Sequence, residues 1–180
     1  DKINIRQFKE GNKFYTKLIQ SDNEIKMEKS RNAHFIREII NPAFYSHIPL
    51  LPFSLPELSG FSNLKEKQYV IIFVGASSNR KMWPSKKYIE LIQNLRNETV
   101  VISGGKGEEF IWNNILSEDH HHICENIVNL IGKTDIMELF SLIKHAKWII
   151  TNDTSASHIC VITKTPSICI LGGAHYGRFQ

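Results

Sequence analysis

Short apolar runs alternate with amphipathic stretches along residues 69–171. A continuous apolar run predicts a strand covered on both faces, whereas apolar residues three and four positions apart predict a helix with one buried side. Five strands are predicted in this way, at 69–74, 99–102, 127–130, 148–151 and 167–171. Four helices are predicted between them, at about 84–95, 108–116, 134–144 and 155–162. This alternation predicts an α/β fold, namely a Rossmann-like, doubly wound parallel sheet.

The first 63 residues follow a different pattern. Helical spacing over about 28–41 predicts a helix with one buried face, formed by Ala33, Ile36, Ile39 and Ile40. Residues 42–63 hold four of the six prolines, a density that forbids a helix or a central strand. We expect an extended connector there, packed on a surface through Leu50, Leu51 and Phe53.

Composition limits the function only loosely. The chain has 180 residues, of which 42% are hydrophobic and 22% charged, as in ordinary globular proteins. Its net charge of +4 suits an anionic ligand or an anionic membrane surface, although a solvated basic face is the plainer interpretation. The chain begins at Asp1, which predicts a fragment or a processed product, and no run reaches the roughly 18 apolar residues of a membrane span. Three cysteines without a CxxC motif predict buried thiols in a reducing compartment.

Polar loops follow all five predicted strands, and in a parallel sheet these loops emerge at one edge. They cover residues 75–83, 103–108, 131–135, 151–155 and 172–178. Four of them lead into helices, whose first N–H groups are unpaired and carry a partial positive charge. The third loop ends at Asp135, and Glu138 follows three residues on, at the spacing of a capping box. The loops therefore predict a crevice for a phosphate-bearing ligand.

Three familiar kinds of site do not fit the sequence. A P-loop ending in Gly132-Lys133-Thr134 would need glycine where Ile127 stands, and Gly104-Gly105-Lys106-Gly107 does not satisfy the GxGxxG pattern of usual NAD sites. His120, His121 and His122 follow Asp119, but adjacent histidines cannot all face one ion. We expect no metal site at these histidines, which are more typical of an exposed loop.

Four segments, in order, resemble glycosyltransferase family 9, the heptosyltransferases of lipopolysaccharide core synthesis. They are YVIIFVGASSNRKMWPSKKY at 69–88, SGGKGE at 103–108, NLIGKT at 129–134 and TNDTSASH at 151–158. Each segment is weakly specific alone, but together they extend over most of residues 69–178. The resemblance implies a GT-B architecture, in which two Rossmann-like domains face each other across a cleft.

If the chain follows this family, it is the C-terminal half of a GT-B fold. Residues 1–63 would be the end of the N-terminal domain and the interdomain linker, and residues 64–180 the donor-binding domain. The resemblance implies transfer of a sugar from a nucleotide diphosphate sugar, such as ADP-heptose, to a lipid-linked lipopolysaccharide or lipooligosaccharide acceptor. The catalytic base would lie in the N-terminal domain, outside this chain. No metal cofactor and no nucleic-acid partner are expected, and the location would be cytoplasmic, with peripheral association at the inner membrane as one option.

The resemblance also assigns roles in the first two loops. Lys81 would contact the donor diphosphate and stabilise the charge that develops on the leaving group. Ser77 and Ser78 would donate to phosphate, with turn capping as the alternative. Glu108 would accept from the ribose hydroxyls, with a helix N-terminal carboxylate as the alternative. Trp83 is expected to anchor its loop by packing.

The remaining donor contacts are expected in later loops. The turn of Asp153, Thr154 and Ser155 would present N–H groups and hydroxyls to the donor phosphates. Asp153 itself would orient the loop or meet a sugar hydroxyl, or else act as an N-cap. His158 is either a phosphate ligand or a structural histidine. The other expected donor contacts are two glycines, Gly105 and Gly132.

Two departures from the family pattern leave the donor open. Ser155 stands where the family usually has glycine, and the sequence from Gly172 to His175 replaces a commoner Gly-Pro-Thr. The sugar could therefore differ from heptose and the base from adenine. A GT-B-like nucleotide-sugar epimerase and a non-catalytic nucleotide-binding module remain as alternatives.

Overall fold

The computed structural model describes residues 19, 27–48, 50–51, 54–118 and 126–172. The chain divides into two compact units, one made of residues 1–47 with 175–180 and the other of residues 48–174. The predictions for Cys124, for the histidines at 120–122 and for residues 173–178 concern positions outside the described residues.

The first unit contains helix α2, Glu28–Ile39, which confirms the predicted helix. Its predicted buried face is only partly correct. Ala33 is buried, but Ile39 is 50% exposed and Ile40, just past the helix, is 71% exposed. Helical spacing places these side chains on one stripe, but a stripe becomes buried only where a second surface covers it.

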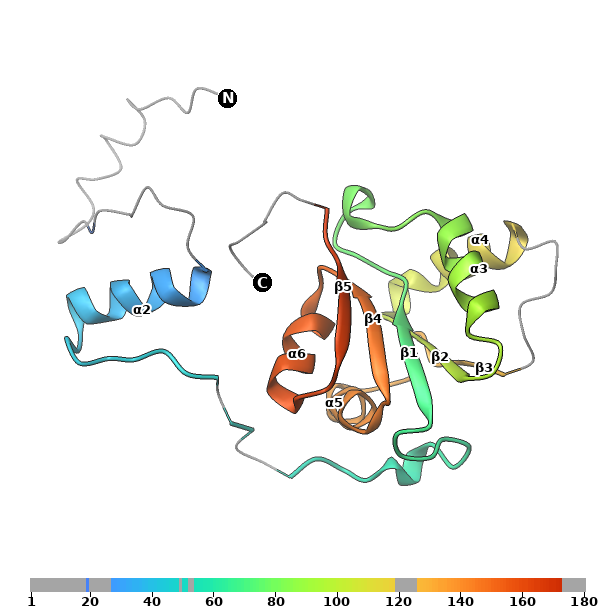
Figure 1. Cartoon of the computed structure of the whole chain (residues 1–180), viewed down its shortest axis with the longest axis horizontal. Helices are drawn as coiled ribbons and strands as arrows, with labels where there is room; N and C mark the ends of the chain where they lie inside the picture. Colours follow the sequence, from blue (N-terminus) through green and yellow to red (C-terminus); the bar gives the residue numbers. More distant parts are fainter. Residues whose placement is uncertain (1–18, 20–26, 49, 52–53, 119–125, 173–180) are drawn as a thin grey trace. The chain divides into compact units, whose positions relative to one another are not determined.

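The second unit is built on a five-stranded parallel sheet in the order β3-β2-β1-β4-β5 (Figure 1). Its strands are β1 Tyr69–Phe73, β2 Thr99–Ser103, β3 Ile127–Asn129, β4 Trp148–Asn152 and β5 Ser167–Ile170. The chain builds outward from β1 to β3 and then returns to the other side of β1 to add β4 and β5. All five predicted strands are confirmed, to within two residues at their ends.

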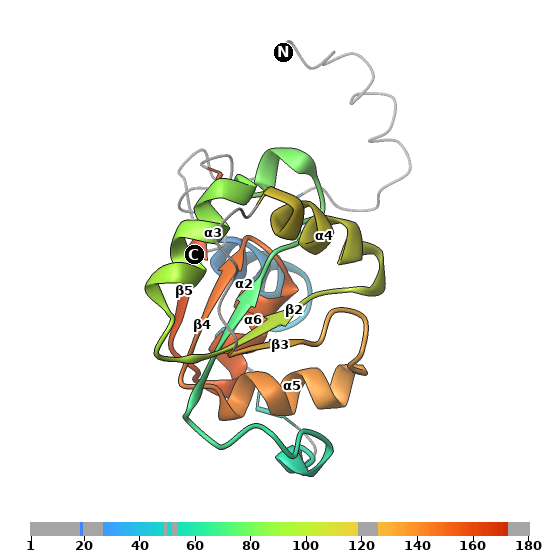
Figure 2. The same ribbon diagram turned by 90° about the vertical axis from the view of Figure 1, so that its right-hand side faces the viewer.

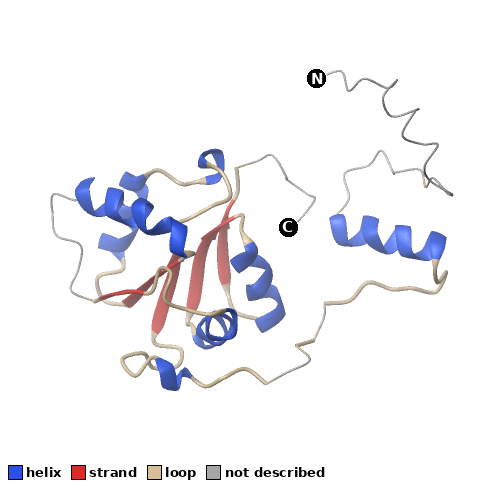
Figure 3. Cartoon of the chain, turned by 180° about the vertical axis from the view of Figure 1, so that it is seen from behind, coloured by secondary structure: helices blue, strands red, loops and turns tan. Residues whose placement is uncertain are grey.

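Helices cover both faces of the sheet (Figures 2 and 3). One face carries α3 and α4, and the other carries α5 and α6. Their bounds are Ser85–Asn94, Glu109–Glu118, Ile136–His145 and Ser155–Thr163, and short 3-10 turns lie at η2 Leu58–Gly60, η3 Asn79–Lys81 and η4 Lys106–Glu108. Helix α4 continues to Glu118, two residues beyond the predicted end of this helix.

Two hydrophobic clusters fill the space between sheet and helices. Along β1, Tyr69, Ile71 and Phe73 belong to the cluster on the α5/α6 face. Ile72 and Val74 belong to the cluster on the α3/α4 face. Both faces of β1 are therefore covered, which is the physical reason for its unbroken apolar sequence.

The α5 N-terminus forms the predicted capping box. The Glu138 N–H donates to Asp135 Oδ1 and the Asp135 N–H donates to Glu138 Oε2, both at 2.8 Å. Two of the otherwise unpaired N–H groups at this helix end are thereby satisfied, and the β3–α5 loop has a fixed direction.

The proline-rich connector packs on the second unit, but not through all the residues we expected. Leu58 and Phe61 pack against the α5/α6 cluster, and the Ser141 hydroxyl of α5 donates to the Pro56 carbonyl. Leu50, by contrast, is 86% exposed, so its predicted packing is wrong. Its neighbouring prolines set an extended direction for the chain, but they do not determine which apolar side chains reach the surface. Phe53 lies outside the described residues.

The cysteine prediction holds for one described residue. Cys160 is buried in α6, and burial raises the pKa of its thiol to about 11. The thiol is therefore protonated at neutral pH and unreactive. Cys169, on β5, is only partly buried.

Gly132 offers a test of the β3–α5 turn. Its φ is +67°, and a Cβ there would lie 2.9 Å from Lys106 Cα. We expect Gly132→Ala to lower the free energy of unfolding by about 1–2 kcal/mol, because an L-residue is strained at this φ. Urea denaturation measures the change. Gly107→Ala is the control, since a Cβ there meets nothing within 4 Å. An equal loss in both variants would contradict this account.

Candidate functional site

A cleft of about 380 Å³ lies at the C-terminal ends of β1, β2 and β4. It is placed where the strand order reverses, between β1 and β4, which is where open α/β sheets bind ligands. Its walls come from three strand ends and from the first turns of η4, α5 and α6. The lining residues are Phe73, Gly75, Ser103, Gly104, Gly105, Glu108, Thr134, Asp135, Ile136, Leu139, Thr154, Ser155 and Ala156.

Glu108 lies at the cleft, and its carboxylate is next to Gly75, after β1, and Gly104, after β2. Its Oε2 accepts from the Gly105 N–H at 2.8 Å, so the carboxylate caps the N-terminus of η4. A Cβ added at Gly75 or at Gly104 would collide with the Glu108 carboxylate. The two glycines therefore give the carboxylate its space, and both predicted interpretations of Glu108 are compatible: it caps a helix end and also faces the cleft.

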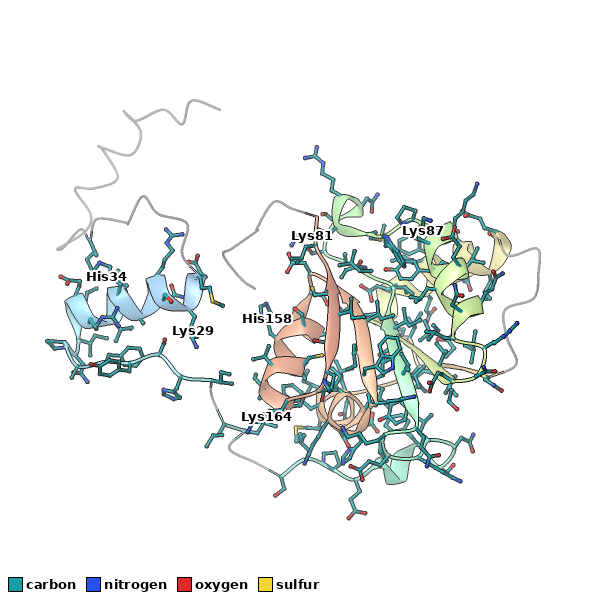
Figure 4. The ribbon with its side chains drawn as sticks, viewed as in Figure 1. Lys29, His34, Lys81, Lys87, His158 and Lys164 are labelled. Atoms are coloured by element: carbon teal, nitrogen blue, oxygen red, sulfur yellow. The ribbon has the colours of Figure 1, made fainter. Side chains whose placement is uncertain are left out.

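Lys81 and Asp153 form an ion pair. Lys81 Nζ, in η3, donates to Asp153 Oδ2, just after β4, at 2.8 Å. Figure 4 shows Lys81 at the end of the sheet where β4 and β5 finish. Asp153 does not act as an N-cap, because Thr154 is the N-cap residue of α6. The expected orienting role of Asp153 has a partner in this lysine.

Asn152 was not singled out from the sequence, yet it ties the two central loops together. It is fully buried, and its Nδ2 donates to the Gly75 carbonyl and to the Tyr88 hydroxyl, both at 2.9 Å. Its Oδ1 has no hydrogen-bond partner among the described residues. A buried amide needs hydrogen-bond partners, so an asparagine at the end of an apolar strand already indicates from the sequence that it bonds to a neighbouring segment.

The α6 N-terminus supplies the hydroxyl wall of the cleft. The Thr154 hydroxyl lies 3.0 Å from the Thr151 hydroxyl and makes no capping bond to the helix. Ser155 is exposed at the first helical position, so its Cβ fits there without a clash with the cleft walls.

Of the predicted donor contacts, Gly105, Glu108, Thr154 and Ser155 line the cleft. The other predicted contacts do not line it; they are Ser77, Ser78, Lys81, Gly132, Asp153 and His158. Ser77 and Ser78 are exposed, and Ser78 makes no side-chain bond at the start of η3. His158 is exposed on α6 (Figure 4). Their contacts with a ligand stay predictions.

Trp83 packs as expected. Its ring meets Tyr88 edge to face, with centroids 5.3 Å apart and an interplanar angle of 87°. Among the described residues, no three histidine, cysteine or acidic side chains are grouped so that they could hold a metal ion. In the same part of the chain, every helix is too short or too polar to cross a membrane.

The fold agrees with the comparisons with known proteins. A family model described as glycosyltransferase family 9 (heptosyltransferase) matches residues 14–180, so the chain belongs to this family. The predicted resemblance is confirmed.

The alignments with individual relatives cover only part of each chain. Lipopolysaccharide heptosyltransferase 2 of Salmonella typhimurium is 30% identical over 117 residues, which are 63% of this chain and 34% of the relative. Lipooligosaccharide heptosyltransferase 2 of Haemophilus influenzae is 30% identical over 94 residues, or 51% of this chain and 27% of the relative. The chain therefore spans about a third or less of these curated relatives.

A solved structure supports the fold directly. The structure of the Escherichia coli ADP-heptose lipopolysaccharide heptosyltransferase II is 29% identical, with a TM-score of 0.57 over 67% of this chain and 39% of that chain. The predicted fold class, a Rossmann-like α/β unit of GT-B type, is confirmed.

Tyr88 makes the cleft scaffold sensitive to alkaline pH. Burial, with a smaller contribution from the Glu108 charge, raises the pKa of Tyr88 to about 12, and the hydrogen bond from Asn152 opposes this rise. The neutral phenol is favoured by folding, so its contribution is complete below pH 10 and is lost as the pH rises from about 10 to 12. We expect a loss of about 2–3 kcal/mol over that range from this group.

Denaturation of Tyr88→Phe tests this expectation. The variant should lose less stability than the wild type between pH 9 and 12, the comparison being made by urea unfolding at each pH. Tyr45, which is 82% exposed, provides the control, and Tyr45→Phe should keep the wild-type slope. Identical slopes in all three proteins would rule out Tyr88 as the titrating group.

Proposed function

We propose that this chain is the donor-binding part of a glycosyltransferase that transfers a sugar from a nucleotide diphosphate to a lipopolysaccharide or lipooligosaccharide acceptor. The observation that carries the proposal is the cleft at the strand-order reversal, which is lined by Glu108, Thr134 and Thr154. The Lys81–Asp153 ion pair includes the residue that precedes Thr154 in the chain. Membership of glycosyltransferase family 9 supports the reaction class.

The donor we propose is ADP-heptose. The E. coli relative is named for this compound, and the curated relatives are named heptosyltransferases of lipopolysaccharide or lipooligosaccharide. Ser155 stands where the family usually has glycine, which leaves the identity of the sugar open. The first assay should therefore compare several nucleotide-sugar donors.

Two charged side chains would bind different parts of the donor. Glu108, with one oxygen already bonded to Gly105 N–H, has a second oxygen free to accept from ribose hydroxyls. Lys81 would stabilise the negative charge that grows on the leaving diphosphate. Ser77, Ser78, Gly132 and His158 would complete the phosphate contacts from the neighbouring loops.

Asp153 keeps Lys81 from binding phosphate with its full charge. An incoming diphosphate must share or replace the carboxylate as partner of the ammonium group. The pair would therefore hold the lysine in position before the donor arrives, and the released carboxylate could accept from a sugar hydroxyl.

The catalytic base and the acceptor site are proposed to lie in the domain that precedes the donor domain. In this division, residues 1–63 are the end of that domain and the linker, and residues 64–180 are the donor domain. We propose a metal-independent reaction in the cytoplasm, with peripheral association at the inner membrane. The net charge of +4 supports contact with an anionic surface.

A nucleotide-binding assay tests the role of Lys81. ADP should raise the thermal midpoint of the chain, because a ligand that binds only the folded state stabilises it. Lys81→Met should weaken ADP binding about 10- to 100-fold, since a charge-assisted hydrogen bond contributes about 1.5–3 kcal/mol. Lys87→Met is the matched control, because Lys87 pairs with Glu90 on α3 and is half exposed. Equal weakening in both would indicate a general charge effect.

A substitution of Glu108 tests the ribose contact. Glu108→Gln keeps one carbonyl oxygen for Gly105 but loses the second acceptor, so ADP should bind about tenfold more weakly by calorimetry. Glu109→Gln, at the exposed adjacent position, should bind ADP like the wild type. The assigned role fails if Glu108→Gln binds ADP, 2′-deoxy-ADP and 3′-deoxy-ADP with wild-type affinities.

The reaction itself is tested on the full-length protein. Release of ADP from ADP-heptose that requires a lipid-linked acceptor identifies a transferase. Conversion of the donor without acceptor identifies an epimerase, and binding without turnover identifies a nucleotide-binding module.

A further inference from the structure

Ser103 carries a buried hydroxyl without a partner. It is the last residue of β2 and is fully buried, and its Oγ makes no hydrogen bond to any described residue. A buried hydroxyl is normally paired, because leaving it unpaired sacrifices the hydrogen bond it would make to water. Such an exception at a cleft requires an explanation.

The strand geometry directs this hydroxyl toward the cleft. Side chains alternate between faces along a strand, so Ser103 shares a face with Val101, which belongs to the α5/α6 cluster. Its register partner Phe73 belongs to the same cluster. Ser103, Phe73 and Leu139 of α5 all line the cleft.

The surroundings of Ser103 favour a nucleoside over a phosphate. Phe73, Ile136 and Leu139 give this part of the cleft apolar walls that suit a planar base or a ribose ring. The nearby Glu108 carboxylate repels a phosphate, and Lys81 is not among the lining residues. A hydroxyl in such a recess can donate to or accept from one polar atom of the ligand.

We propose that Ser103 is a specificity-determining residue whose hydroxyl hydrogen-bonds the nucleoside of the donor. This inference rests on the proposed function and adds a contact that the sequence did not indicate. A site built to hydrogen-bond a ligand group discriminates against ligands that lack this group, because the site's own polar atom then stays unpaired. Ser103 would therefore help to select the nucleotide, while Lys81 binds the diphosphate of any donor.

Calorimetry on the full chain tests the proposal with Ser103→Ala. We expect ADP to bind about 3- to 10-fold more weakly, the loss of one neutral hydrogen bond. The deoxy analogues 2′-deoxy-ADP and 3′-deoxy-ADP separate the two possible partners. If the partner is a ribose hydroxyl, the analogue that lacks this hydroxyl binds to Ser103→Ala and to the wild type with the same affinity. If the partner is the base, Ser103→Ala weakens the binding of both analogues as much as it weakens ADP binding, and it changes the affinity for UDP by a different factor. Either pattern supports the proposal.

Stability of the variant without ligand distinguishes this role from a structural one. Ser103→Ala removes no existing hydrogen bond, so its thermal midpoint should equal or exceed that of the wild type. Ser141→Ala is the matched control, because Ser141 is also buried but donates to the Pro56 carbonyl. That variant should have a lower thermal midpoint and an unchanged ADP affinity.

Two outcomes overturn the inference. One is an ADP affinity of Ser103→Ala within twofold of the wild type, and the other is a thermal midpoint that falls as it does in Ser141→Ala with no change in nucleotide selectivity. Both leave the proposed function intact. A wild-type chain that binds none of ADP, UDP and GDP would instead remove the basis of the donor site itself.

Discussion

The pairing of β1 with both β2 and β4 is the constraint on which the site depends. Parallel register aligns Phe73 with Ser103, and β4 pairs on the other side of β1. The three strands therefore end at one level, and their following loops open onto the same cleft. Asn152, at the end of β4, reinforces this arrangement, because its amide N–H donates to the Gly75 carbonyl in the loop after β1. The polar groups of the cleft are thus positioned by an apolar sheet and by one buried amide.

Most of the fold could be predicted because its signals are local. Unbroken apolar runs, the helical spacing on α3 and the Asp135–Glu138 pair each lie within a few residues of one another. The failures concern surfaces supplied by other segments. The periodicity of α2 indicates which side chains share a face, but not that Ile39 and Ile40 would stay exposed. Leu50 was misjudged for the same reason.

The candidate site was predictable by residue type and less so by contact. Glu108 and the Thr154–Ser155 turn belong to recognisable motifs, and both line the cleft. No motif indicates that the Glu108 carboxylate lies over Gly75, that Lys81 pairs with Asp153, or that the Ser103 hydroxyl is unpaired. These relations join loops distant in sequence, and only the register of the sheet brings them together. The cleft is therefore a property of the sheet edge more than of any single loop.

Gly75 and Glu108 have a consequence for how this sequence can change over time. The carboxylate occupies the space that any side chain at position 75 would need. A mutation of Gly75 alone would expel the carboxylate from the strand ends, whereas a mutation of Glu108 to a short residue would remove the restriction at position 75. Natural drift at the two positions is therefore coupled: a lineage that keeps the Glu108 carboxylate at the strand ends must also keep the glycine at position 75.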